Sequence, residues 1–241
     1  MKLIIFDLDN TLFDTFGQLT LIAHRHAARV LAENGFPTKE DFILKARLEI
    51  SRENPRLTSQ EINALVFKKY GLADPRLIKL GEDAYYNNII PQEGLRPFPD
   101  TIPTLTKLKM RGFILALITS GRTSLQKEKI KNLGIEDYFE YIEVDDKEKL
   151  NIKTKEKSFK KVTASFKVAP KDALSVGDQI NLDIRDAKKL GMLTVQMLHG
   201  RYRYLKPEDP LEIPDYRIFK ISGLLKIKEL GVKTNHHNYQ I

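Results

Sequence analysis

The chain has 241 residues, of which 41% are hydrophobic and 30% are charged, a balance typical of a folded soluble protein and unlike that of a disordered, collagenous or membrane-spanning chain. It contains no cysteine, which excludes disulfides, thiolate metal sites and thiol catalysis. Its net charge of +8 is compatible with nucleic-acid binding, with an anionic small substrate, or simply with a lysine-rich surface.

Short apolar runs alternate with helix-like segments along much of the chain. Buried strands are predicted for residues 2–6, 113–118, 173–176 and 193–197. Helices are predicted for residues 100–109, 123–133, 155–166 and 182–190, with Asp100 as the cap of the first and Gly112, Gly134 and Gly191 after three of them. Strands separated by helices of this length predict an α/β fold with a parallel sheet and right-handed crossovers.

Residues 16–95 interrupt this alternation because they contain no convincing strand. Apolar residues recur at helical spacing between Leu19 and Val30, Thr58 and Glu61 match a capping box, and Asp74-Pro75 marks the start of another helix. The simplest account is a helical insertion after the first strand, with residues 94–100 as the return linker.

Two carboxylates follow the first predicted strand, in the segment Asp7-Leu-Asp9-Asn-Thr11. Open α/β sheets bind their ligands at the carboxyl ends of strands, and side-chain alternation would direct both acids to one side if the strand continued. One carboxylate could then act as nucleophile and the other as general acid/base. Taken alone, the segment could equally be an ordinary acidic turn.

A second acidic segment has the same design, since Gly177 and Asp178 follow the predicted strand 173–176 and Asp183 comes five residues after Asp178. Carboxylates that converge from two strand ends form a hard-oxygen site of the kind that Mg²⁺ uses to bind phosphate substrates.

Two weaker features lie between these segments. Thr119, Ser120 and Gly121 end a predicted strand, where hydroxyl and backbone N–H groups could hold phosphoryl oxygens. Lys153 precedes the predicted helix 155–166 and could place a positive charge in the site. Taken singly, a strand-end hydroxyl or a surface lysine explains each of them as well.

In this order, the four segments resemble the motifs of the haloacid dehalogenase-like (HAD) hydrolase superfamily, and the resemblance covers nearly the whole chain. The matching residues are Asp7, Asp9 and Thr11 in the first motif, Thr119 in the second, Lys153 in the third, and Gly177, Asp178 and Asp183 in the fourth.

The chain departs from the family pattern at two positions: Ser120 replaces a frequent Asn, and Thr154 replaces a usual Pro. Three other lysines lie near Lys153, at positions 149, 155 and 157. Phe159, six residues after Lys153, favours Lys153 as the motif lysine.

The resemblance implies a Rossmann-like parallel-sheet core formed by residues 1–15 and 96–241, with residues 16–95 as an inserted α-helical cap domain. It also implies that Asp7 attacks phosphorus to form an aspartyl-phosphate, while Asp9 protonates the leaving alkoxide and then deprotonates water, with a pKa that allows both states near the working pH.

The same resemblance implies the ligand set. Mg²⁺ would be held by Asp7, the backbone carbonyl of Asp9 and Asp178, with Asp183 as a further ligand or as support. Lys153 and Thr119 would stabilise charge on the transferring group, and Ser120 would join them in binding the substrate.

Three functions fit these residues. The first is a Mg²⁺-dependent phosphatase acting on a small phosphorylated metabolite. The second is a 2-haloacid dehalogenase, which the presence of Asp9 and of the Gly177-Asp178 motif disfavours. The third is a non-catalytic binding protein on the same fold, which the retention of every motif residue disfavours. A phosphomutase or another phosphoryl-transfer enzyme is a further possibility.

The remaining expectations concern partners and setting. We expect no nucleic-acid partner, because no glycine is followed by lysine as a P-loop requires, and no membrane partner. We expect a cytoplasmic monomer or homodimer, and the lack of cysteine and tryptophan beside abundant lysine and glutamate suggests a thermophilic source.

Overall fold

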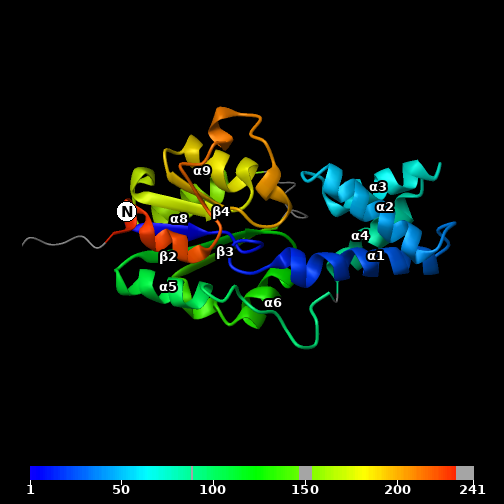
Figure 1. Ribbon diagram of the computed structural model, residues 1–241, viewed down its shortest axis with the longest axis horizontal. Coiled ribbons are helices and arrows are strands. Elements are labelled where there is room, and N and C mark those ends of the chain that lie inside the picture. Colours follow the sequence, from blue (N-terminus) through cyan, green and yellow to red (C-terminus); the bar gives the residue numbers. More distant parts are fainter. Residues whose placement is uncertain (88, 147–153, 232–241) are drawn as a thin grey trace, which may run out of the picture.

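The computed structural model describes residues 1–87, 89–146 and 154–231, and it contains a six-stranded parallel sheet with strand order β3-β2-β1-β4-β5-β6 (Figure 1). The strands are β1 (Leu3–Phe6), β2 (Ile114–Ser120), β3 (Tyr141–Asp145), β4 (Ala173–Gly177), β5 (Leu193–Met197) and β6 (Tyr216–Ile218). The predicted parallel sheet is confirmed. The two edge strands, β3 and β6, were not predicted; both are only partly buried.

The register of the central strands brings the motif residues to one edge of the sheet. Phe6 of β1 lies opposite Leu117 of β2 and Val176 of β4. One or two residues after these three aligned positions come Asp7, Thr119 and Asp178, which therefore lie at the carboxyl ends of three adjacent strands. Ligands of open α/β sheets bind at this edge.

Helices cover both faces of the sheet, as Figure 1 shows. On β1, Ile4 and Phe6 belong to a cluster with residues of α5 (Thr101–Met110) and α6 (Thr123–Leu133). Leu3 and Ile5 point to the other face and pack with residues of α8 (Glu156–Ser165) and α9 (Arg185–Lys189). Such alternation on a strand buried on both sides explains why the sequence reads as one continuous apolar run.

Between β1 and α5 the chain forms four helices that lie together beside the sheet, which we call the helical unit: α1 (Leu21–Glu33), α2 (Glu40–Glu53), α3 (Ser59–Lys69) and α4 (Pro75–Tyr86). A five-residue π-helical turn, Phe16–Thr20, leads into α1. The capping box of Thr58 and Glu61 is present, and Asp74 caps α4 as predicted. The prediction did not include α2.

The helical unit has a hydrophobic cluster of its own, separate from the two clusters of the sheet. Its buried members come from α1, α2, α3 and the α1–α2 connection; they are Ala28, Leu31, Phe36, Ile43, Leu44, Ala46, Val66 and Phe67.

Two local predictions differ from the structure in detail. Asp100 precedes α5, but its side chain makes no capping hydrogen bond; Oδ2 accepts instead from the backbone N–H of Ser222, 2.9 Å away. The predicted helix 182–190 is a π-helical turn, Ile180–Ile184, followed by the short α9. Within the described residues, no helix is both long and apolar enough to cross a membrane.

Candidate active site

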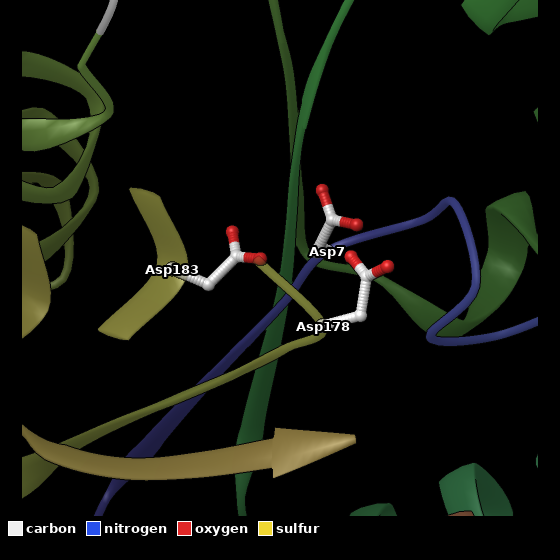
Figure 2. A group of neighbouring side chains, drawn as sticks. All are labelled: Asp7, Asp178 and Asp183. Carbon is white, nitrogen blue, oxygen red and sulfur yellow. The ribbon is translucent and has the colours of Figure 1, made fainter. Parts of the chain in front are cut away.

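Three buried carboxylates from two strand ends face one another at the carboxyl edge of the sheet. Asp7 follows β1, Asp178 follows β4, and Asp183 lies in the π-helical turn after Asp178 (Figure 2). One carboxylate oxygen from each residue lies within 4.8 Å of the others. Their exposed fractions are 5%, 0% and 1%, so water contributes little to their solvation.

Gly177 makes this approach possible. A Cβ atom at position 177 would collide with the carboxyl group of Asp183. The turn also fixes Asp183, because its Oδ2 accepts from the backbone N–H of Gln179, 3.0 Å away.

Burial and the repulsion of neighbouring charges disfavour the charged forms of Asp7 and Asp178. Burial, together with the charges of Asp183 and Asp9, raises the pKa of Asp7 to about 7, although Lys155 opposes the shift. The pKa of Asp178 is raised well above its ordinary value, by burial and by the charges of Asp7, Asp183 and Asp9.

The oxygens of this group are also short of donors. Within the described part of the chain, both carboxylate oxygens of Asp178 and Oδ2 of Asp7 are buried without a hydrogen-bond partner. Native proteins rarely leave buried polar atoms unsatisfied, and hard oxygen donors are the ligands that divalent cations prefer. These residues therefore fit a divalent metal ion.

Lys155 is the lysine that the structure brings to the carboxylates. Its Nζ lies 2.5 Å from Oδ1 of Asp7, 2.7 Å from Oδ1 of Asp183 and 3.0 Å from the carbonyl oxygen of Ile118. Burial alone would lower the pKa of this ammonium, but the carboxylates of Asp183 and Asp7 raise it. Lys153, the predicted motif lysine, lies outside the described residues.

Asp9 lies on the other side of Asp7 and has a different environment. Its Oδ1 accepts from Nζ of Lys129 and from the hydroxyl of Thr15, both at 2.8 Å, and its Oδ2 accepts from Nε2 of Gln126 at 2.9 Å. Burial opposes ionisation, but Lys129 and these hydrogen bonds lower the pKa of Asp9 below its ordinary value. The family resemblance implied that the pKa of Asp9 lies near the working pH. Without substrate, the site instead favours the ionised form of Asp9.

The two hydroxyl residues of the second motif lie close by. Thr119 is fully buried, and its Oγ1 lies 2.6 Å from Nε2 of Gln126. The carbonyl oxygen of Ser120 accepts from the same amide, at 3.1 Å.

A cavity of about 310 Å³ opens beside Asp9 and Ser120, between the sheet edge and the helical unit. Lys129 and Asn181 line it from the core, and Tyr85 and Tyr86 of α4 line it from the helical unit. The cavity is the space in which a small molecule could reach Asp9.

Two arginines make charged contacts between the helical unit and the core near this cavity. Arg56 makes a two-pronged contact with the carboxylate of Glu212, at 3.3 and 3.0 Å. Arg122, just before α6, lies 2.6 Å from Oδ1 of Asp83 in α4, with its guanidinium over the ring of Tyr86.

Three further arginines of residues 16–95 lie at three different places. Arg47 is fully buried, with Nη2 3.2 Å from the hydroxyl of Ser59, which lines the cavity. Arg25 is exposed and lies 3.8 Å from Glu40. Arg52 is exposed and lines a separate groove that His199 also borders.

Sequence reasoning missed Gln126 and Lys129. Both lie on α6, three residues apart, next to the apolar residues Leu125 and Ile130 that pack on the sheet. Two polar side chains at i and i+3 on the buried face of a helix that directly follows the Thr119 segment were the available signal.

Comparison with known proteins agrees with this site. The model of the haloacid dehalogenase-like hydrolase family matches residues 1–191. The chain is 34% identical over 229 residues to a glyceraldehyde 3-phosphate phosphatase of Pyrococcus furiosus, covering 95% of this chain and 93% of that protein. It is 30% identical over 230 residues to the protein of the same name from Methanopyrus kandleri, covering 94% and 97%.

The fold agrees as well: the crystal structure of a HAD phosphatase from Thermococcus onnurineus superposes with a TM-score of 0.64 at 26% identity, covering 96% of this chain and 99% of that one. The chain therefore belongs to the haloacid dehalogenase-like hydrolase family. Within that family it is a phosphatase, a hydrolase of phosphate monoesters.

Proposed function

We propose that this enzyme is a Mg²⁺-dependent phosphatase of a small phosphorylated metabolite, and that it works through an aspartyl-phosphate on Asp7. The observation that carries the proposal is the group of buried, unpartnered oxygens on Asp7 and Asp178 beside an acid, Asp9, that borders a cavity. A nucleophile and a candidate metal site beside an acid/base group that borders a cavity are the components that hydrolysis of a phosphate ester needs.

In the proposed mechanism, Mg²⁺ would be held by Asp7, the backbone carbonyl of Asp9 and Asp178, as the family resemblance implies. The side chain of Asp9 is engaged by Lys129 and Gln126. Asp183 would support the site indirectly, because its two oxygens already accept hydrogen bonds from Lys155 and Gln179. When bound, the metal neutralises charge on the phosphoryl oxygens.

The chain's own residues would divide the remaining work. Asp7 attacks phosphorus, and Asp9 gives a proton to the departing ester oxygen and later takes one from the attacking water. A bound phosphate dianion opposes the lowered pKa of Asp9 and favours the protonated acid that the first step requires. We assign to Lys155 the role that the sequence suggested for Lys153, together with Thr119 and Ser120 around the phosphoryl group.

We further propose that residues 16–95 act as a cap over a core of residues 1–15 and 96–241. The helical unit supplies Tyr85 and Tyr86 to the cavity wall, and its separate hydrophobic cluster supports its treatment as a unit. The modest cavity and the names of the two relatives favour a three-carbon phosphate such as glyceraldehyde 3-phosphate as the substrate.

The test is release of inorganic phosphate from glyceraldehyde 3-phosphate, phosphoglycolate and a hexose phosphate, with EDTA or with Mg²⁺. We expect Mg²⁺-dependent release, fastest from the three-carbon ester. Full activity in a metal-free preparation would contradict the metal requirement, and a preference for the hexose phosphate would contradict the proposed substrate.

A further inference from the structure

Helix α6 presents two donors to the two oxygens of Asp9. Gln126 and Lys129 lie three residues apart and so share one face of the helix. Nε2 of Gln126 is 2.9 Å from Oδ2 of Asp9, and Nζ of Lys129 is 2.8 Å from Oδ1. Both side chains are buried, with 1% and 6% exposed, so water does not compete for these contacts.

The contacts hold more than one atom of the site. The amide of Gln126 also reaches the hydroxyl of Thr119, at 2.6 Å, and the carbonyl oxygen of Ser120, at 3.1 Å. Thr15 adds a second donor to Oδ1 of Asp9. The plane of the Asp9 carboxyl group is therefore fixed from two sides, and its position is tied to the end of β2.

A carboxylate has about four lone-pair positions, so these donors leave capacity for one more partner. Asp9 and Lys129 both line the cavity, which is the direction from which a substrate would arrive. Proton transfer requires the acid within hydrogen-bond reach of the oxygen and correctly oriented, and small misplacements reduce rates strongly.

We propose that Gln126 and Lys129 are positioning residues that hold the carboxyl group of Asp9 toward the leaving oxygen of the substrate. This inference rests on the proposed function, in which Asp9 is the acid/base. In the first step the bond from Asp7 to phosphorus forms while the ester P–O bond breaks, and the proton of the Asp9 carboxyl moves to the ester oxygen, which leaves as an alcohol. In the second step water gives a proton to Asp9 and its oxygen bonds to phosphorus, while the bond from Asp7 to phosphorus breaks.

The test uses the leaving group as the readout. The two substrates are p-nitrophenyl phosphate, an aryl ester, and glycerol 3-phosphate, an alkyl ester. p-Nitrophenolate departs readily without a proton, whereas the alkoxide of glycerol 3-phosphate does not. We would measure single-turnover rates of alcohol release from both esters, with Mg²⁺ and excess enzyme. In Gln126→Met and in Lys129→Met we expect the alkyl ester to slow by about 10- to 100-fold and the aryl ester by less than about 3-fold.

Three comparisons make the result decisive. Asp9→Asn is the reference and should show the same selective loss, only larger. Lys127→Met, which alters an exposed lysine on the same helix, should change neither rate. Lys129→Arg keeps a charged donor and should recover part of the alkyl-ester rate.

The outcomes distinguish the positioning role of Gln126 and Lys129 from the proposed acid/base role of Asp9 on which it rests. Selective loss in Asp9→Asn but equal loss on both esters in Gln126→Met and Lys129→Met would overturn the positioning role and leave Asp9 as the acid. An unselective Asp9→Asn would overturn the proposed role of Asp9 itself. If Gln126→Met does not fold, as judged by circular dichroism, Gln126→Asn replaces it, because its amide is one methylene shorter and withdraws from Asp9.

Discussion

The ammonium group of Lys155 lies 2.5 Å from Oδ1 of Asp7. It also contacts Asp183. One positive charge therefore lies beside a group of three buried carboxylates, those of Asp7, Asp178 and Asp183. Three negative charges less one positive charge leave two negative charges when all are ionised. One divalent cation would balance this remainder. Burial, and after it the repulsion between these charges, raises the pKa values of Asp7 and Asp178.

The position of Lys155 predicts how the two candidate lysines will behave. Lys155→Met should reduce kcat by about 100-fold or more, because it removes a buried cation that contacts the nucleophile. Lys153→Met should leave more activity than Lys155→Met. The measurement is kcat with Mg²⁺, and thermal melting checks that each variant folds. A larger loss in Lys153→Met would assign the role to Lys153.

Asp7→Asn should fold and lose turnover by about 10⁴-fold or more, because the amide cannot form the aspartyl-phosphate. Acid quench of the wild-type enzyme during turnover, followed by mass spectrometry, should locate a phosphoryl group on Asp7. The exposed Asp41 provides the matched control, since Asp41→Asn should keep full activity. Ordinary turnover by verified Asp7→Asn would refute the nucleophile.

The raised pKa values predict how stability depends on pH in the absence of metal. In the folded state Asp7 and Asp178 keep their protons above the ordinary carboxyl pKa of about 4. Their contribution to stability is therefore present below about pH 4 and is lost as the pH rises through about 7, the value for Asp7. The proposed Mg²⁺ site would use the ionised carboxylates, so the effect of Mg²⁺ on Tm should be larger at pH 8 than at pH 5.5.

Asp178→Asn tests the same balance of charge. At pH 8 the metal-free variant should melt above the metal-free wild type, because a buried repulsive charge is gone. Its Tm should then respond little to Mg²⁺. An undiminished metal-induced shift in this variant would show that the ion binds elsewhere.

The cavity wall predicts which residues of the helical unit affect specificity. Tyr85→Leu or Tyr86→Leu should change the ratio of kcat/KM between a three-carbon and a hexose phosphate by about 10-fold, because both rings border the cavity. Arg52→Ala should leave the ratio unchanged, since Arg52 lines a different groove. A ratio that responds only to Arg52→Ala would place the specificity pocket in that groove.

The sequence was sufficient for the parts of the site that depend on strand ends. Asp7, Thr119 and Asp178 each follow a continuous apolar run, and parallel strands bring such positions to one edge. It was not sufficient where several residues of one type compete. Lysines at 149, 153, 155 and 157 look alike in sequence. Lys155, which lies just before α8, is among the described residues and contacts Asp7 and Asp183.

Other features depend on tertiary contacts that a local sequence pattern signals only weakly. Gln126 and Lys129 are ordinary residues for a helix surface, and only the approach of α6 to Asp9 buries them. The edge strands β3 and β6 lack the long apolar runs of buried strands, because each has one neighbour in the sheet and is partly exposed.

The hydrophobic cluster of the helical unit shares no buried residue with the clusters that flank the sheet. Repacking within this cluster therefore need not disturb Asp7, Asp178 and Asp183, whereas Ala23 of α1 and Tyr85 and Tyr86 of α4 pack with the cluster on one face of the sheet. Residues that would touch the leaving group and residues that would perform hydrolysis can then be substituted independently of each other. A lineage that carries this chain could thus acquire a new substrate through changes in the helical unit while the chemistry at the sheet edge stays intact.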